Sequence, residues 1–462
     1  MANVLLVNLG SLPMPGNDPI FPIGLRCIQD ALDREGHRTR LVDFVEDPPA
    51  REHLSWVKGP WDVIGFTIRN IDPIDLSCDG HVAHYEAFLG EVREVLGSDR
   101  PLLVGGGPGY SLFAPQLTSR LGFDVGVVGP GESVMLDIVA DPHRYTGSGS
   151  TISGGRYPGF VRDTLEHPVR LMRAYAARNG SIGLETKRKT CYQGCVYCPY
   201  AYVSGENAGD LKPMESIAAE LRKAHENGIR DVFFTDGIFN SELRFAKDVV
   251  RTVIGADLPG LTWSAYFTPK PFDDEFADLV SVSNAGPVIV SPDSLDDRVM
   301  RLLGKSFDTR HVTRFIERCR RRKMKFKVSV VLGGPGENRE SVRNTARYLN
   351  EHLESDELTL NVGYRILPET AMARQVGLSP DEILDPTFYP LDPEIFSWII
   401  SELDSRFLVT ARMLNLIGGR TASRTMHKIP LDQAAFDPAA VAITRRSLPL
   451  VETRSGRGSR CV

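Results

Sequence analysis

Short apolar runs alternate with amphipathic segments over the first part of the chain. Between the apolar runs, segments with an apolar residue every three or four positions predict helices at 23–35 and 85–96. The apolar runs predict β-strands at 4–9, 40–44, 63–68, 102–104 and 125–128. Because strands that alternate with helices assemble into a parallel sheet, residues 1–142 are expected to form a doubly wound, Rossmann-like α/β domain.

A second alternating region follows a stretch rich in serine and glycine. The run 147–155 indicates that residues 143–180 form a linker. Over residues 181–378 the alternation predicts a partial (β/α)6 barrel with its catalytic groups at the carboxyl ends of the strands. Its strands are expected at 182–186, 232–235, 262–267, 288–290, 326–332 and 358–366. Residues 379–462 then predict a small helical and irregular region, with helical spacing over 396–417.

Composition and charge argue against a nucleic-acid-binding, membrane-spanning or exported protein. The chain has 462 residues, 42% of them hydrophobic and 24% charged, which is ordinary for a globular protein with two or three domains. A net charge of -5 provides no overall basic field for nucleic acid. No apolar run is long enough to cross a membrane, and the N-terminus lacks the layout of an export signal. We therefore expect a cytoplasmic protein with no nucleic-acid or membrane partner.

Three of the seven cysteines stand close together, at Cys191, Cys195 and Cys198. Thiolates are the protein ligands of cubane iron-sulfur clusters, and such clusters usually take four of them. Since no fourth cysteine is nearby, one iron would be left open to bind a substrate. The alternatives are a zinc site, which would need a fourth ligand and commonly a second C-x-x-C pair, and a disulfide, which suits a secreted chain. Cys461 lies in a tail that is rich in arginine and glycine and is not expected to be a ligand.

The C-x-x-x-C-x-x-C spacing resembles the signature of the radical S-adenosylmethionine (SAM) superfamily. The resemblance implies a 4Fe-4S cluster whose open iron binds the amino and carboxylate groups of SAM. One-electron cleavage would then yield a 5′-deoxyadenosyl radical, with the electron coming from a flavodoxin-like or ferredoxin-like reductant. Tyr197, just before the last thiolate, would offer a flat apolar surface to the adenine.

Polar residues that follow the barrel strands are the candidate SAM contacts. By the same resemblance, Asp236 would accept a hydrogen bond from the methionyl ammonium, and Ser291 and Asp293 would bind the ribose hydroxyls. Gly334 lies in a glycine-rich turn that would pass beside the adenosyl group. Arg365 would engage a carboxylate of cofactor or substrate, since a guanidinium forms bidentate pairs.

Two glycine-rich turns follow the fourth and fifth strands of the first domain. They permit close backbone approach to a bulky ligand, although neither a G-x-G-x-x-G turn after the first strand nor a Walker lysine motif is present. The candidate ligand contacts are Gly106, Gly107, Gly109, Ser111, Gly129, Gly131 and Glu132. Together with the segment 69–72, Arg-Asn-Ile-Asp, the turns resemble the cobalamin-binding domain of B12-dependent radical SAM enzymes. One branch of that family includes tryptophan C-methyltransferases.

Cobalamin would be held here without a histidine ligand. The D-x-H-x-x-G loop that supplies this ligand in methionine-synthase-like proteins is missing, because Asp79-Gly80-His81 continues to His84 where glycine should be. Arg69 is the candidate to lie against the lower cobalt face. Its alternative role is an ion pair with Asp72 or Asp75 at the sheet edge.

The resemblance implies a methyltransferase that moves a methyl group from SAM, through methylcobalamin, to a carbon centre of a small metabolite or peptide. A second hypothesis keeps both cofactors but uses them for rearrangement, cyclisation or dehydration. A third is a cluster protein for electron transfer or sensing. A fourth has the first domain as a degenerate Rossmann layer that binds no corrin.

Overall fold

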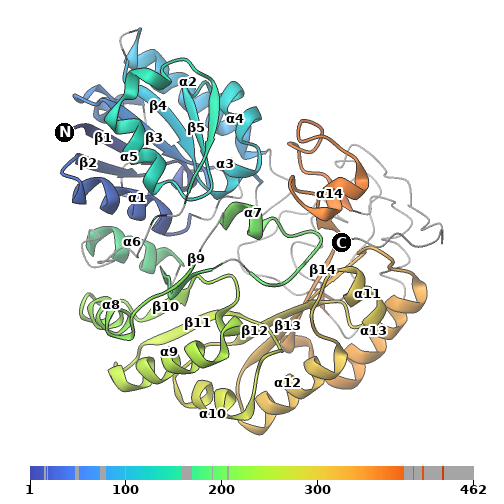
Figure 1. Cartoon of the computed structure of the whole chain (residues 1–462). Helices are drawn as coiled ribbons and strands as arrows, with labels where there is room; N and C mark the ends of the chain where they lie inside the picture. The colour runs from blue at the N-terminus through green and yellow to red at the C-terminus, as the bar shows by residue number, and fades with distance from the viewer. Residues whose placement is uncertain are drawn as a thin grey trace.

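Two six-stranded parallel sheets form the protein, one in each half of the chain (Figure 1). The first sheet, near the N-terminus, lies above the second, and helix α7 lies between them. The computed structural model describes residues 1–14, 17, 19–46, 51–72, 80–98, 100–155, 157, 169–179, 181–189, 191–204, 208–389, 399, 408–409 and 429–430.

The first sheet has the strand order β2-β1-β3-β4-β5-β6, with every neighbouring pair parallel. Its strands are β1 (Asn3–Asn8), β2 (Arg38–Asp43), β3 (Val63–Thr67), β4 (Leu102–Gly106), β5 (Val125–Val128) and β6 (Ser150–Ser153). Its helices are α1 (Ile23–Arg34), α2 (His81–Leu96), α3 (Pro108–Leu112), α4 (Ala114–Leu121) and α5 (Glu132–Ala140). The doubly wound α/β prediction is confirmed.

Alternate residues of the central strands pack against helices on opposite faces of this sheet. Val4 and Leu6 of β1 join the cluster with α1 and α5, whereas Leu5 and Val7 join the cluster with α2 and α4. Burial on both faces explains the nearly continuous apolar runs by which these strands are recognised in the sequence.

Strand β6 corrects the predicted linker, because it lies inside the range 143–180. It is a polar edge strand that pairs in parallel with β5. Asp124 holds the turn before it, since its carboxylate binds Arg100 at 2.6 Å and accepts a hydrogen bond from the Gly147 backbone N–H at 3.0 Å. An exposed strand that is held by polar contacts leaves no apolar pattern in the sequence.

The second sheet has the order β14-β13-β12-β11-β10-β7 and is the predicted partial barrel. Its strands are β7 (Ile182–Leu184), β10 (Asp231–Phe234), β11 (Thr262–Phe267), β12 (Val288–Asp293), β13 (Phe326–Leu332) and β14 (Leu358–Val362). Its helices are α8 (Met214–Glu226), α9 (Leu243–Ala256), α10 (Asp274–Val282), α11 (Asp297–Leu302), α12 (Thr309–Arg321) and α13 (Arg339–His352). The strands alternate between buried and half-buried positions, so one face packs on the helices and the other lines the barrel interior.

The last predicted barrel strand, 358–366, is two elements. The chain turns at Gly363, and β15 (Tyr364–Arg365) leaves the barrel to pair with β16 (Phe388–Tyr389) in a separate antiparallel ladder. Helix α14 (Ala371–Val376) lies between them in sequence. In the segment 396–417, for which the spacing predicts a helix, Leu408–Val409 is instead strand β17, paired with β18 (Ile429–Pro430). Apart from Ile399, the rest of that segment lies outside the described residues.

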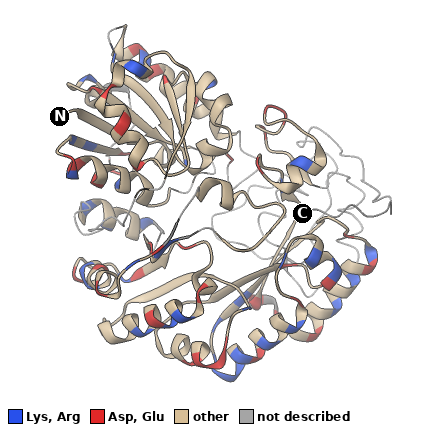
Figure 2. Ribbon diagram, in the orientation of Figure 1, with Lys and Arg blue, Asp and Glu red and all other residues tan. Residues whose placement is uncertain are grey.

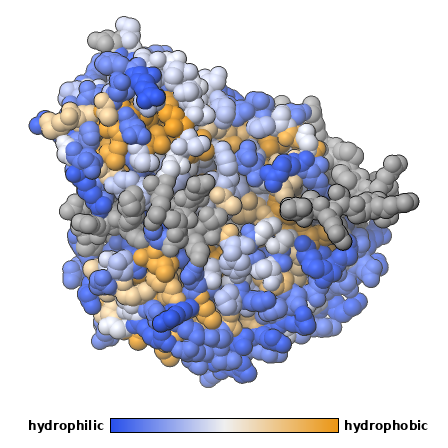
Figure 3. Space-filling view, viewed as in Figure 1, coloured by the Kyte–Doolittle hydropathy of each residue, from blue (hydrophilic) through white to orange (hydrophobic). Residues whose placement is uncertain are grey.

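Charged residues gather on the outer helices of the barrel (Figure 2), and hydrophilic residues cover much of that surface (Figure 3). The arginine-rich end of α12 belongs to this charged surface. Asp274 binds both Arg321 and Arg322 at 3.1 Å, so local acidic residues balance the basic run. Among the described residues, no helix combines the length and apolar character that a membrane-spanning segment requires.

A buried polar cluster joins the two halves. Asn8 and Asp43 end β1 and β2, and both bind the hydroxyl of Tyr175 on α6 (Val169–Asn179). The Tyr175 hydroxyl donates to the Asp43 carboxylate at 2.9 Å, and the Asn8 amide donates to Asp43 at 2.8 Å. Burial raises the pKa of the Asp43 carboxyl group, although these hydrogen bonds partly offset the effect.

Candidate active site

The three predicted cluster cysteines lie in one loop between strand β8 (Lys187–Lys189) and helix α7 (Tyr200–Ser204). Strand β9 (Ala208–Leu211) returns along β8 and closes the base of the loop as an antiparallel ladder. The Cys198 backbone N–H donates to the Cys195 carbonyl oxygen at 3.1 Å, which places the last two cysteines on a tight turn. The structure therefore brings the three predicted ligands together.

All three thiols are free, and Cys195 lies close enough to Cys191 and Cys198 to raise the pKa of both. Burial raises the pKa of Cys191, and negative charge at Cys195 raises it further. Burial also raises the pKa of Cys198, with added contributions from Cys195 and Cys191. Thiolates in this loop therefore need cationic partners, which iron ions of a cluster would supply. Within the described ranges, no three His, Cys, Asp or Glu side chains are arranged to hold a single metal ion.

A short segment after α11, Leu303 to Ser306, runs alongside the cysteine loop. The Val196 backbone N–H donates to the Leu303 carbonyl oxygen at 3.1 Å. The Ser306 backbone N–H donates to the Gln193 side-chain oxygen at 3.2 Å. We call residues 303–306 the strap, because its contacts follow the loop from Gln193 to Val196.

Lys305 of the strap enters a buried polar group with two predicted site residues. Its ammonium lies 2.5 Å from the Asp293 carboxylate, and both side chains are 4% exposed. It also donates to the Tyr197 hydroxyl at 3.1 Å and to the Ser291 carbonyl oxygen at 2.9 Å. The Tyr197 hydroxyl donates in turn to Asp293.

Tyr197, Ser291 and Asp293, the expected SAM contacts, therefore have partners within the protein. The Asp293 carboxylate faces Lys305 and Tyr197 and is closed to solvent, so the structure does not present it to a ribose. Ser291 contributes its backbone carbonyl to the same group. The ring of Tyr197 packs against Tyr364, with the centroids 4.9 Å apart.

Asp236 also supports the loop from within. One carboxylate oxygen accepts hydrogen bonds from the Thr186 and Lys187 backbone N–H groups at 3.1 and 3.2 Å. The other oxygen accepts from the Thr186 hydroxyl and lies 3.8 Å from the Lys187 ammonium. Burial raises the pKa of Asp236, but Lys187 and these hydrogen bonds counteract the rise. The Asp236 carboxylate, predicted to bind the methionyl ammonium, thus has several contacts within the chain.

Arg365 and Gly334 likewise have partners in the protein. The carboxylate that Arg365 engages is Asp72 of the first domain, with the Arg365 Nε 2.9 Å from the Asp72 Oδ2. Gly334 packs on Leu303 and Tyr364, where a side chain would meet both at about 3.0 and 3.2 Å. Arg365 therefore joins the two halves of the protein. The missing side chain of Gly334 leaves room for Leu303 of the strap.

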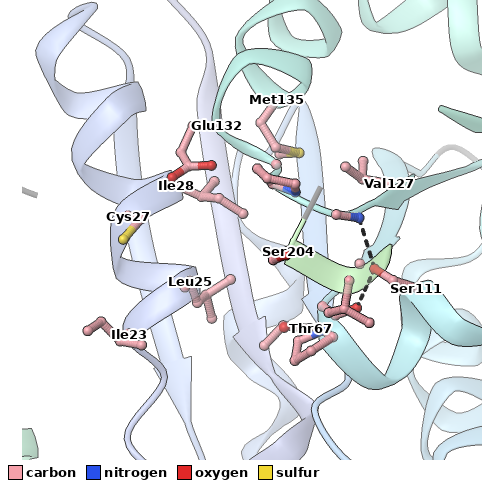
Figure 4. Close-up of a pocket in the computed structure, with 18 of the residues that line it drawn as sticks. Ile23, Leu25, Cys27, Ile28, Thr67, Ser111, Val127, Glu132, Met135 and Ser204 are labelled. Atoms are coloured by element: carbon pink, nitrogen blue, oxygen red, sulfur yellow. Dashed lines mark hydrogen bonds between the residues drawn. The ribbon is translucent and has the colours of Figure 1, made fainter. Parts of the chain in front are cut away.

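A cavity of about 310 Å³ lies where residues after the first sheet's strands meet residues of the cysteine-loop region. Figure 4 shows α1, with Leu25 and Ile28, on one side of it and Ser204 of α7 among the other residues that line it. Of the predicted contacts, Gly106, Gly107, Ser111, Gly129, Gly131, Glu132 and Asp236 line the cavity. The two glycine turns and the helix that follows the cysteines thus share one space.

The glycine turns are shaped by close backbone packing. Gly107 has φ +105°, and a side chain there would lie 2.6 Å from the Ile68 carbonyl oxygen. Gly109 is not among the residues that line the cavity, and it packs against the Arg69 carbonyl oxygen. The Ser111 hydroxyl links the turns, since it donates to the Gly107 carbonyl at 2.8 Å and accepts from the Gly129 N–H at 3.0 Å (Figure 4). Where these turns meet the cavity, its wall is therefore formed largely by backbone, which suits a large flat ligand.

Glu132 belongs to a charged group at the wall of the cavity. Arg188, from the strand before the cysteine loop, binds Glu132 and Glu185, each at 2.8 Å, and donates to the Cys27 sulfur at 3.1 Å. Burial and the charge of Glu185 raise the pKa of Cys27 well above its usual value. The group joins the first sheet to the barrel, which the sequence analysis did not foresee.

Arg69 lies just beyond the carboxyl end of β3 and faces the barrel. Its guanidinium donates to the Asn70 side chain at 3.2 Å, while Asp72 binds Arg365 instead. Partial burial lowers the pKa of Arg69, and the phenol of Tyr266 on β11 acts in the opposite direction. Arg69 therefore points toward the space that the barrel encloses; Asp75, its other suggested partner, lies outside the described residues.

No sequence pattern assigned a site role to Lys187, Arg188 or Lys305. The first two stand in the run Lys187-Arg188-Lys189 directly before the cysteine loop. Positive charge in sequence next to cysteines indicates stabilised thiolates, so this run could have identified Lys187 and Arg188 as residues that support the site. Lys305 is 107 positions beyond Cys198, and only the fold brings it to the loop.

Residues 189–349 match the family model of the Radical SAM superfamily. This match confirms the resemblance that the cysteine spacing indicates. A curated relative, tryptophan 2-C-methyltransferase of Streptomyces laurentii, is 22% identical over 465 aligned positions, which cover 82% of this chain and 75% of the relative.

Two solved structures of the radical SAM methyltransferase TsrM from Kitasatospora setae share the fold. One, with tryptophan substrate and a SAM analogue bound, has a TM-score of 0.73 at 21% identity and covers 96% of each chain. The other, with cobalamin and a 4Fe-4S cluster bound, has a TM-score of 0.67 at 23% identity and covers 82% of this chain and 76% of that one. The arrangement of a Rossmann-like domain followed by a radical SAM barrel is confirmed.

Proposed function

We propose that the protein is a cobalamin-dependent radical SAM methyltransferase that methylates a carbon centre of a small molecule. The observation that carries the proposal is the shared cavity, to which the glycine turns of the first domain and helix α7 after the cysteine loop both contribute. Cofactors in the two halves would then face the same space. When bound, cobalamin supplies a methyl carrier, and the cluster supplies one-electron chemistry.

The chain's own residues hold and separate these groups. Cys191, Cys195 and Cys198 would ligate the cluster and leave one iron without a protein cysteine. The backbone of the two glycine turns would approach the cobalamin, and Arg69 would lie against its lower face. In this arrangement the contact between the two halves would exclude water from the site, which protects radical intermediates.

The barrel interior supports an aromatic substrate. Phe233 and Tyr266 project from neighbouring strands with their rings edge to face and the centroids 5.2 Å apart. Tyr266 is 52% exposed, although it lies on a central strand of the sheet. Such a surface favours stacking of a planar ring. The curated relative is named for tryptophan methylation, so tryptophan is the first substrate to test.

We assign residues 1–155 to the cobalamin-binding domain, since β6 completes its sheet. Residues 181–378 form the radical SAM barrel in this assignment. An external reductant of flavodoxin or ferredoxin type would supply the electron. The free thiols of the cysteine loop suit a reducing cytoplasm.

Anaerobic reconstitution tests the proposal. Wild-type protein is expected to bind one 4Fe-4S cluster and one corrin per chain and to transfer the label from trideuteromethyl-SAM to its product. Cys191→Ala should lose the cluster and the release of 5′-deoxyadenosine, while the buried Cys319→Ala on α12 should keep both. Turnover to an unmethylated, rearranged or dehydrated product would refute the methyltransferase, and zinc in place of iron would refute the entire assignment.

A further inference from the structure

We propose that Lys305 is a positioning residue that sets the reduction potential of the cluster at the cysteine loop. The inference rests on the proposed function, because it requires an iron-sulfur cluster at Cys191, Cys195 and Cys198. Lys305 does not line the cavity, and its ammonium lies against the cysteine loop. It would act through the cysteine sulfurs.

The positive charge of Lys305 acts on all three cysteines. Its ammonium interacts with the Cys195 sulfur and electrostatically with Cys191 and Cys198. Lys187, a second buried lysine near the loop, also interacts electrostatically with Cys191. The charge of Lys305 is therefore placed to act on the whole cluster and not on a single cysteine.

The strap keeps this charge in place. Gly304 has φ +80°, and a Cβ atom there would lie only 1.9 Å from the Gly194 carbonyl oxygen. The strap and loop backbones are thus in direct contact one residue before Lys305. The partners of the ammonium, Asp293, Tyr197 and the Ser291 carbonyl, then fix its direction.

Asp293 is held in an unusual backbone conformation beside the ammonium. Its φ of +63° is in the left-handed region, which residues other than glycine rarely adopt. The strand register between β12 and β13 shifts at the same point. Backbone strain of this kind persists where the surroundings hold a residue firmly, here with its carboxylate against Lys305.

The expected effect follows from simple electrostatics. A reduced cluster carries one more negative charge than an oxidised one, so a nearby buried cation stabilises the reduced form more. Hydrogen bonds to the sulfurs and local charge are among the factors that set cluster potentials. Lys305 should therefore raise the potential, and Asp293 should partly oppose it.

The test is a redox titration of the reconstituted full-length protein, followed by electron paramagnetic resonance. For Lys305→Met we expect the ratio of reduced to oxidised cluster at a fixed potential to fall at least tenfold, which is about 59 mV for a one-electron couple. Asp293→Asn should shift the ratio the other way, and the double variant should fall between the two. Lys325→Met, at an exposed position directly before β13, is the matched control and should match the wild type.

The iron content of the wild type and of each variant distinguishes a failure of the proposed function from a failure of the inference about Lys305. If wild-type protein assembles no cluster, the proposed function fails and the inference falls with it. If the variants keep full iron content but their potentials do not follow the predicted order, only the inference is overturned. If Lys305→Met does not assemble a cluster, Asp293→Asn decides, because an unchanged or lower potential in that variant contradicts the role of the pair.

Discussion

Arg365 binds Asp72 across the boundary between the barrel and the first domain, although the two residues are 293 positions apart. The guanidinium also donates to the carbonyl oxygens of Ile366 and Leu384, at 2.7 and 3.2 Å. Asp72 is the last residue of the segment 69–72, which begins with Arg69. The pair therefore fixes the β3 turn relative to the barrel.

Removing this pair should loosen the contact between the halves. Arg365→Ala leaves a half-buried Asp72 carboxylate unpaired, and we expect the free energy of unfolding to fall by roughly 2 kcal/mol. Thermal unfolding measures the change. The exposed Arg251, which binds Asp248, provides the control, and Arg251→Ala should cost less than about 1 kcal/mol. Equal losses in the two variants would contradict a specific role for Arg365.

Glu337 should make stability depend on pH. Burial raises its pKa from 4.5 to about 7, so the folded protein holds a proton that the unfolded chain releases above pH 4.5. The free energy of unfolding should therefore fall as the pH rises from 4.5 through 7. At pH 8, Glu337→Gln should be more stable than the wild type by roughly 3 kcal/mol, and the difference should vanish near pH 4.

Denaturant unfolding at several pH values checks this expectation. Glu340→Gln, at an exposed position in the first turn of α13, is the matched control and should change stability by less than about 0.5 kcal/mol at any pH. A wild-type profile that is parallel to that of Glu337→Gln would show that Glu337 is not the responsible group.

Filling the cavity should block corrin binding without unfolding the protein. A Cβ atom at Gly106 meets its nearest neighbour at an ordinary 3.7 Å, so the fold tolerates a side chain there. Since Gly106 lines the cavity, we expect Gly106→Leu to weaken hydroxocobalamin binding at least tenfold in an absorption titration. Gly90→Leu on α2, where open space surrounds the glycine, should bind normally. Undiminished binding by Gly106→Leu would show that the corrin does not bind in this cavity.

Arg69 should affect the corrin and not the cluster. We expect Arg69→Ala to fold and to assemble its cluster, because the side chain forms only one hydrogen bond, to Asn70, that the structure records. The absorption spectrum of bound cobalamin should change, since its lower face would gain water in place of the guanidinium. An unchanged absorption spectrum in a variant that is fully loaded with cobalamin would show that Arg69 does not contact the corrin.

Local pattern was sufficient for the architecture and for the grouping of the three cysteines in one loop. The apolar runs of β1, β3 and β13 follow from burial in a parallel sheet, a constraint that repeats along each strand. The spacing of Cys191, Cys195 and Cys198 is a property of one loop, so the sequence contains it completely. Strand β6 escaped prediction because Asp124 and backbone hydrogen bonds hold it, with no apolar periodicity.

Only the tertiary structure decided how the polar residues at the strand ends are used. Asp236, Asp293 and Arg365 have the side chains that a ligand contact requires, but each is bound by a group from another part of the chain. Lys305 reached the cysteine loop by the same long-range packing. The sequence by itself determined which chemical groups the protein has and in what order its strands follow one another along the chain. The fold decided which groups face each other, because a buried charge is stabilised by whichever opposite charge the packing brings within hydrogen-bonding distance.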